Sequence, residues 1–153
     1  MWAPSGHNRR PWHFTIIENK VIMQKINSDT KEACENSEDP LYYGWANNNK
    51  YNAFYNAPIL VIFSYRKDGF SPIDDLGAAS QNMGLAAECL GVGSCGIGFI
   101  NKLFENDSKK HEEYRKLLNI PKDYTLHHGM VFGYPKNSKL KPQPRKGTFN
   151  RIK

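Results

Sequence analysis

The sequence lacks any long apolar run, since no stretch approaches the ~20 residues that a membrane-spanning helix needs. Cysteine is scarce as well: Cys34, Cys89 and Cys95 are the only three, and no two of them have metal-ligand spacing. Met1 leads directly into a polar segment, so no secretory signal peptide is predicted. Together these features favour a reduced, cytoplasmic protein that does not associate with membranes.

Motifs of the common enzymes that work through side chains are also missing, because GxSxG, HExxH and Walker A sequences do not occur. The segment GVGSCG at 91–96 precedes a predicted strand, whereas a dinucleotide fingerprint opens a helix after one. His127 and His128 are expected to alternate on a strand and point to opposite faces, which argues against a shared metal. Nothing near Cys95 in the sequence would lower its pKa, so a buried structural thiol is favoured over a nucleophile. Neither a catalytic side chain nor a metal site is predicted.

The net charge of +6 is concentrated at one end of the chain. Residues 136–153 contain seven of the 21 Lys and Arg and no acidic residue, so the other 135 residues carry 14 basic and 15 acidic side chains. This extended basic tail could contact nucleic acid, bind one compact anion, or be a solvated terminus. Because the rest of the chain is nearly neutral, no nucleic-acid partner is predicted.

With 153 residues, 39% of them hydrophobic and 24% charged, the chain is expected to form a single domain over 1–153. The segments with strand character are 12–18 and 21–26, read as a hairpin around Asn19-Lys20, then 58–65, the turn and strand of 91–100, and 126–134. The segments with helical character are 72–90, preceded by Ser71 and stopped by Gly91, and 109–120 after Ser108. The helix at 72–90 has few polar positions and is expected to be buried. This order predicts an α+β sandwich with helices against a mainly antiparallel sheet.

Several segments suit a planar, phosphorylated cofactor better than a side-chain mechanism. Glycines at 91, 93, 96 and 98 would bring backbone N–H groups close to a flat or anionic ligand, although a tight turn would need only one or two of them. Ser5, Gly6 and Asn8 form a second polar loop, and Arg145 with Lys146 offers a cationic fork for a phosphate. Aromatic residues that could wall such a ligand are Tyr42, Tyr43, Trp45, Tyr51, Phe54 and Tyr55. Together these features suggest flavin mononucleotide (FMN).

Four segments, in order and over nearly the whole chain, resemble the nitroreductase family of FMN-dependent oxidoreductases: WAPSGHNRRPWHFTII, NAPILVIF, DLGAASQNMGLAAECLGVGSCGIGF and GMVFGYPK…KPQPRK. The resemblance implies a nitroreductase-like homodimer with FMN at two sites in the subunit interface. It places the helix at 72–90 in that interface.

The resemblance also implies which residues meet the cofactor. One loop of the family contacts the flavin that is held mainly by the partner subunit. The residues of this chain that match the loop are Pro4, Ser5, Gly6 and Asn8. Those matching the turn beside the isoalloxazine, with a backbone N–H directed at the flavin N5, are Cys95, Gly96, Ile97 and Gly98. Arg145 matches the position that reaches the phosphate. The aromatic segment 42–55 is expected to shape the pocket for the electron acceptor.

The activity that the resemblance implies is a ping-pong reaction. NAD(P)H gives hydride to the flavin and leaves, and a nitroaromatic, quinone or similar acceptor then takes the electrons. Because the cofactor carries the chemistry, no acid–base side chain is expected. Family members usually begin with a helix bearing arginines for the FMN phosphate, and this chain starts where that helix would end. The alternative is therefore a flavin-binding or dimeric remnant without turnover.

Overall fold

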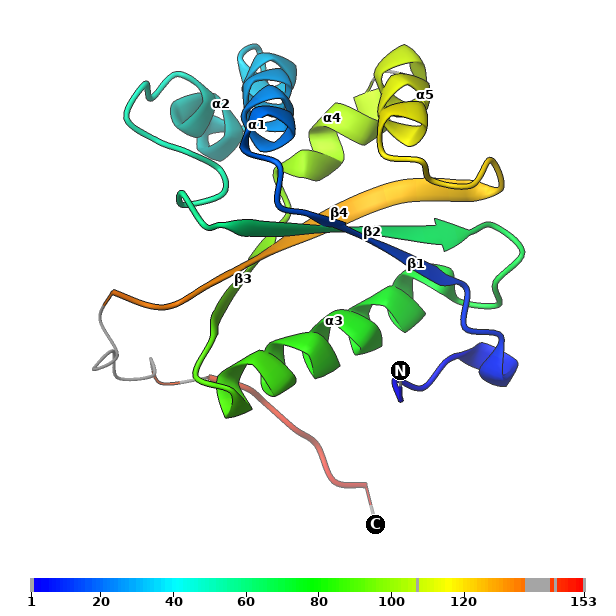
Figure 1. Ribbon diagram of the computed structural model, residues 1–153. Helices are drawn as coiled ribbons and strands as arrows, with labels where there is room; N and C mark the ends of the chain where they lie inside the picture. Colours follow the sequence, from blue (N-terminus) through cyan, green and yellow to red (C-terminus); the bar gives the residue numbers. More distant parts are fainter. Residues whose placement is uncertain (1, 107, 137–143, 145, 153) are drawn as a thin grey trace.

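A four-stranded antiparallel sheet lies at the centre of the molecule, with the strand order β1-β2-β4-β3 (Figure 1). The computed structural model describes residues 2–106, 108–136, 144 and 146–152. The strands are β1 (Trp12–Ile17), β2 (Ile59–Arg66), β3 (Gly93–Ile97) and β4 (Tyr124–Gly133). The central strands are β2 and β4, so β1 and β3 form the two edges of the sheet.

Helices cover both faces of this sheet (Figure 1). On one face lie α1 (Lys20–Cys34), α2 (Pro40–Ala46), α4 (Ile100–Asn106) and α5 (Ser108–Leu117). On the other face lies α3 (Pro72–Cys89), next to the short 3-10 helix η1 (Gly6–Asn8) that precedes β1. This arrangement confirms the predicted α+β fold, a mainly antiparallel sheet flanked by helices. In the described part of the chain, no helix is long and apolar enough to cross a membrane.

Strand β2 forms the middle of the core. Its residues Leu60 to Ser64 are all buried, as predicted for a strand covered on both faces. Leu60 and Ile62 belong to the large apolar cluster under α1, α2, α4 and α5. Val61 and Phe63 alternate to the other side and pack in a second cluster with residues of α3. One strand therefore contributes to both layers of the sandwich.

The predicted second strand of the hairpin, 21–26, is wrong, because this segment begins helix α1. Instead of forming a turn, Asn19 caps the helix: its side-chain oxygen accepts hydrogen bonds from the amides of Val21 (2.9 Å) and Ile22 (3.2 Å). The buried residues of α1 are Met23, Ile26, Thr30 and Cys34, a spacing of three to four residues that matches a helix face. The β-rich composition of 21–26 favours a strand over this short segment, but the burial pattern of the whole helix, with its longer period, decides the structure.

The predicted helix at 72–90 is confirmed as α3, but the expectation that it is buried on most sides is wrong for the single chain. Leu76 and Ala79 pack against the sheet. Ile73, Leu85 and, at the C-cap, Leu90 are nevertheless exposed by 54%, 56% and 77%. Large apolar side chains are thus exposed to solvent near the start, the middle and the end of α3.

Candidate functional site

An open hollow of about 610 Å³ lies along the edge strand β3. Its lining comes from the segments 55–58, 93–95 and 131–136. The volume falls within the ~300–1,000 Å³ typical of small-molecule sites. Because β3 is an edge strand, alternate backbone N–H and C=O groups point away from the sheet rather than to a neighbouring strand. Hydrogen-bonding backbone therefore borders a hollow of ligand size.

The glycines around β3 fall into two groups. Gly91 has φ +69°, and a Cβ on Gly93 would lie 3.2 Å from the carbonyl oxygen of Gly133. The geometry of the turn and the sheet thus accounts for these two. Around Gly96 and Gly98, in contrast, no described atom of the chain lies within 4 Å of the position of a Cβ. The chain's own packing gives no reason for glycine at these two positions, which are open to approach from outside.

The side chains of this segment differ in their access to the hollow. Cys95 is exposed, so the prediction of a buried structural thiol is wrong for the single chain. Protein atoms around its sulfur partly desolvate it and raise the pKa of the Cys95 thiol, which keeps the thiol form at neutral pH. Ile97 is only 2% exposed and belongs to the core. A ligand can therefore contact the backbone of Ile97 but not its side chain.

The N-terminal loop is pinned in an unusual conformation. The Ser5 hydroxyl accepts a hydrogen bond from the Arg10 amide (2.9 Å), and the Arg10 side chain donates to the Asn8 amide oxygen (3.1 Å). His7, Asn8 and Arg10 have φ values of 52°, 55° and 48°, the left-handed region that residues with a Cβ rarely adopt. Such strain persists only where the surroundings hold it, and it concentrates at functional sites.

Asp75 in the first turn of α3 anchors this loop, and sequence reasoning missed it. The Gly6 amide donates to the Asp75 Oδ1 atom (2.9 Å), and Asp75 is 6% exposed. The Gly6 N–H is therefore engaged within the chain. The outward donors of the loop are the Ser5 hydroxyl hydrogen and the Asn8 side-chain amide, while Pro4 is exposed beside them. The only signal for Asp75 in the sequence is that it is an acidic residue in the first turn of a helix. Its contact with Gly6, 69 residues away, becomes visible only in the fold.

The two groups of predicted site residues do not meet within one chain. The loop at 4–8 leads into β1 and is anchored at the start of α3, whereas β3 follows the end of α3 (Figure 1). Three strand spacings separate the two edges of the sheet, about 14 Å, and α3 has 18 residues, about 27 Å of helix. One small ligand cannot contact both groups of a single chain. Arg145 lies outside the described residues.

The two adjacent histidines of β4 lie on the same face, so the predicted opposite orientation is wrong. A β-bulge opposite Phe63 and Ser64 interrupts the alternation of side chains. The rings of His127 and His128 are 5.2 Å apart, and His128 stacks on Phe63 at 4.5 Å. Burial lowers the pKa of His128 to about 4, so its imidazole is neutral. Among the described residues, no three His, Cys, Asp or Glu are grouped to hold a metal ion.

The predicted aromatic wall divides between the core and the hollow. Trp45 and Phe54 are 6% and 2% exposed and pack in the core. Tyr55 lines the hollow beside Cys95 and is 55% exposed.

A sheet between helices, with an open glycine-bearing edge strand beside a ligand-sized hollow, defines a small-molecule-binding α+β protein.

Comparison with known proteins gives the family. The model of the Nitroreductase family matches residues 1–134, so the chain belongs to the nitroreductase family. It is 31% identical to a nitroreductase from Bacteroides fragilis solved with bound FMN, with a TM-score of 0.82 over 99% of this chain and 81% of that one.

Two curated relatives are similar over most of this chain. One, from Archaeoglobus fulgidus and assigned the name NADH dehydrogenase/NAD(P)H nitroreductase, is 27% identical over 139 residues, 91% of this chain and 70% of that protein. The other, an iodotyrosine deiodinase from Thermotoga neapolitana, is 28% identical over 151 residues, 91% of this chain and 74% of that protein. The family thus includes relatives named for different reactions.

Proposed function

We propose that the chain binds FMN along β3 and is a flavin-dependent oxidoreductase that takes hydride from NAD(P)H and passes it to a nitroaromatic, a quinone or a similar acceptor. The observation that carries the proposal is the open space at Gly96, on the edge strand β3, and at Gly98, just after its end. A flat ring can lie against backbone there because no Cβ stands in its way. FMN bound in a relative 31% identical to this chain supports the choice of cofactor.

The residues of this segment fit such a group. A Cβ at Gly96 or Gly98 would project into open space, which a ligand can fill. Within the segment Cys95, Gly96, Ile97 and Gly98, the backbone N–H groups that face away from β4 would orient the ring, and Arg145 would hold the phosphate. Bound FMN supplies the redox chemistry, so the protein has to bind and orient it and exclude water.

We also propose a homodimer with the outer side of α3 in its interface. The exposed Ile73, Leu85 and Leu90 provide an apolar surface for a second copy. The loop with Pro4, Ser5, Gly6 and Asn8 lies too far from the β3 of its own chain, and in a dimer it would complete the site of the other chain. This explains why a strained, anchored loop stands at the start of the sequence.

The test begins with the visible absorption spectrum of the protein after incubation with FMN and desalting. We expect flavin to be retained, its absorbance to bleach anaerobically with NADH or NADPH, and the colour to return on addition of a nitroaromatic or a quinone. Ping-pong turnover would give parallel lines in double-reciprocal plots. Loss of all flavin on desalting would overturn the proposal. Flavin retained but reduced by neither nucleotide would favour the alternative, a flavin-binding protein without turnover.

A second candidate reaction is reductive dehalogenation of a halogenated phenol, which the similarity to an iodotyrosine deiodinase favours. It uses the same site and the same cofactor. Halide release from an iodophenol by the reduced protein would support this reaction. An intact iodophenol after complete oxidation of the reductant would exclude it.

A further inference from the structure

Two tyrosine hydroxyls form a pair, and one of the two tyrosines, Tyr55, lines the hollow. The Tyr51 hydroxyl donates a hydrogen bond to the Tyr55 hydroxyl at 2.6 Å, and the rings meet edge to face with centroids 5.6 Å apart. Each phenol carries one hydrogen, and only one hydrogen can lie between the two oxygens. The pair therefore retains the hydrogen of Tyr55, which it can donate to a third group.

Tyr55, which retains this donor, is the member of the pair that borders the hollow. Tyr55 lines the hollow together with Ser94 and Cys95, and its side chain is 55% exposed. The preceding residue, Phe54, fills the core at 2% exposure. Burial, followed by the hydrogen bond to Tyr55, raises the pKa of Tyr51, so its hydroxyl stays protonated and continues to donate.

The backbone at Tyr55 is held in a conformation that an aromatic residue rarely adopts. Tyr55 and Asn56 have φ values of 51° and 57°. Asparagine tolerates the left-handed region, but a tyrosine there is strained. Backbone hydrogen bonds from Tyr55 to Asn52 (3.0 Å) and from Ala57 to Phe54 (2.8 Å) hold the segment in place. The ring of Tyr55 is exposed in this conformation, and strained residues of this kind cluster at ligand sites.

A row of aromatic contacts fixes the pair relative to the glycine segment. The ring of Tyr51 packs edge to face on Trp45 with centroids 5.5 Å apart. Trp45 in turn stacks on Phe99 at 4.4 Å with an angle of 13° between the planes. Phe99 directly follows Gly98, so the row of rings links the hydroxyl pair to the glycine segment.

We propose that the Tyr51–Tyr55 pair binds the oxygen atom of an aromatic electron acceptor, such as a nitro, quinone or phenolate oxygen. This inference rests on the proposed function and deepens it by naming the acceptor's chemistry. A hydrogen bond donated by Tyr55 stabilises the negative charge that such an oxygen carries or gains on reduction. The pair thus determines specificity for acceptors that carry a hydrogen-bond-accepting oxygen. It contributes little to the reduction of acceptors that take electrons from the flavin without binding in the hollow.

The first test measures binding rather than turnover. 4-Nitrophenolate is titrated into the protein without NAD(P)H, both with FMN and without it, and its visible absorbance reports the bound anion. Removing one hydrogen bond to a charged oxygen should weaken binding at least tenfold in Tyr55→Phe. Tyr51→Phe should show a smaller loss, because the Tyr55 hydroxyl remains. Tyr124→Phe, at a tyrosine at the opposite end of β4 from the hollow, serves as the matched control and should bind as the wild type does.

The second test compares two acceptors in the FMN-loaded protein. In Tyr55→Phe, kcat/KM should fall at least tenfold for a quinone and stay unchanged for ferricyanide, with an unaltered rate of flavin reduction by NAD(P)H. A structural role would change all three rates together. Equal phenolate affinity and equal quinone kcat/KM in Tyr55→Phe and wild type would overturn the inference, as would a wild type that does not bind phenolate. A wild type that binds phenolate but is never reduced by NAD(P)H would refute the proposed function alone.

Discussion

At the scale of single residues, glycines that look alike in the sequence have different reasons to be there. Gly91 adopts a positive φ and Gly93 lies close to the backbone of Gly133, whereas Gly96 and Gly98 border open space. The sequence predicted that only one or two glycines would serve a tight turn, and it could not say which. That assignment depends on the pairing of β3 with β4, which joins residues more than 30 positions apart.

This difference leads to a prediction for two substitutions. Gly98→Val should weaken FMN binding at least tenfold, because the added methyl groups occupy the space that the flavin ring needs, while the melting temperature changes little. Gly91→Ala is the matched control: its positive φ should cost about 1 kcal/mol of folding free energy and leave FMN affinity unchanged. Flavin fluorescence titration and thermal unfolding of both variants provide the measurements. Unchanged FMN affinity in Gly98→Val would argue against a site along β3.

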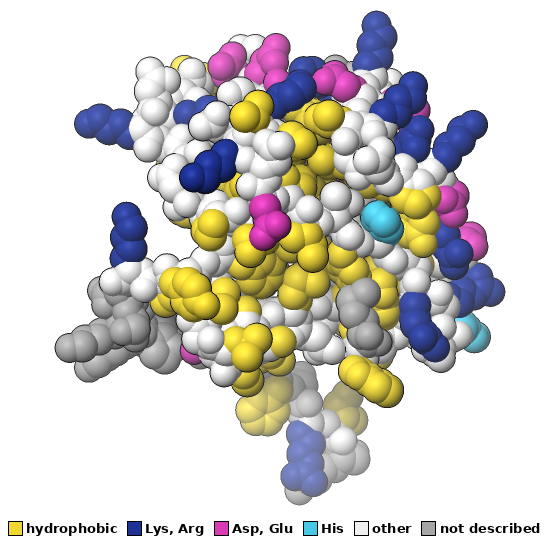
Figure 2. All heavy atoms as spheres, in the orientation of Figure 1, with side chains coloured by type: hydrophobic (Ala, Val, Ile, Leu, Met, Phe, Trp, Pro, Cys, Tyr) yellow, Lys and Arg dark blue, Asp and Glu magenta, His cyan; other side chains and the backbone are white. Residues whose placement is uncertain are grey.

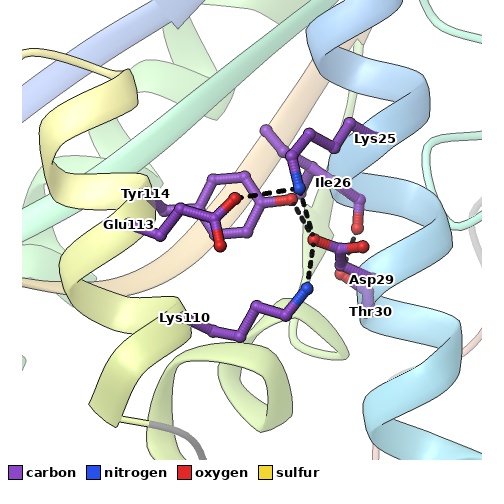
Figure 3. A network of polar contacts seen from close by, with 7 residues as sticks. All are labelled: Lys25, Ile26, Asp29, Thr30, Lys110, Glu113 and Tyr114. Atoms are coloured by element: carbon purple, nitrogen blue, oxygen red, sulfur yellow. Dashed lines mark hydrogen bonds and ion pairs between the residues drawn. The ribbon is translucent and has the colours of Figure 1, made fainter.

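At the scale of elements, a polar network joins α1 to α5 across 85 positions of the sequence (Figure 3). Asp29 accepts a hydrogen bond from the Tyr114 hydroxyl (2.6 Å) and pairs with Lys25 and Lys110, both at 2.9 Å. Lys25 also pairs with Glu113 at 3.0 Å. Tyr114 is fully buried, so its hydroxyl depends on Asp29 for a partner. The network fixes the helical layer that covers the large core cluster.

The network should make folding stability depend on acid pH. Burial alone would raise the pKa of Asp29, but hydrogen bonds from Tyr114, Lys25 and Lys110 outweigh it and lower that pKa from 3.8 to about 2. Because the folded pKa lies below the unfolded one, the contribution is complete above about pH 4 and is lost as the pH falls through about 2. A shift of this size corresponds to about 2 kcal/mol.

Asp29→Asn should therefore cost about 2 kcal/mol of unfolding free energy at neutral pH, and the difference from wild type should shrink as the pH approaches 2. Urea unfolding at a series of pH values measures it. Glu18→Gln, at an exposed carboxylate outside the network, is the control and should leave the stability unchanged. A difference for Asp29→Asn that stays constant down to pH 2 would show that the charge of Asp29 is not responsible.

At the scale of the whole molecule, the apolar surface of the single chain is uneven. Figure 2 shows hydrophobic side chains gathered over the middle and lower part of the visible face, while Lys and Arg lie mainly toward its upper and right margins. The lower part is where Figure 1 places α3, and Ile73 and Leu85 of this helix are exposed. Water-exposed apolar area of this kind favours association with a second copy.

Leu85→Glu should therefore convert the proposed dimer to a monomer and, at the same time, abolish FMN retention, because the loop of one chain would no longer complete the site of the other. Sedimentation and the flavin spectrum are to be measured on the same sample. Val21→Glu, at an exposed apolar residue of α1 in the opposite helical layer, should change neither. A monomeric Leu85→Glu variant with wild-type FMN affinity would show that each chain binds the cofactor by itself.

Local signals and long-range contacts determined different parts of this protein. The continuous apolar run of β2, the start of α3 at Ser71-Pro72 and its end before Gly91 were predicted from the sequence, because each depends on neighbouring residues. The family was also evident from the ordered segments. The helix over 21–26 was not predicted, because Val21 and Ile22 favour a strand locally, whereas the burial of Met23 and Ile26 on one helix face against the sheet decided the outcome.

Long-range contacts likewise set the bulge that places His127 and His128 on one face, the anchoring of Gly6 by Asp75, and the exposure of Cys95. Each of these depends on strands or helices that are distant in the sequence and meet only in the fold. The candidate site residues could be named from the sequence, since their types and order are local. Their division between two opposite ends of α3 could not be, because that distance exists only in three dimensions.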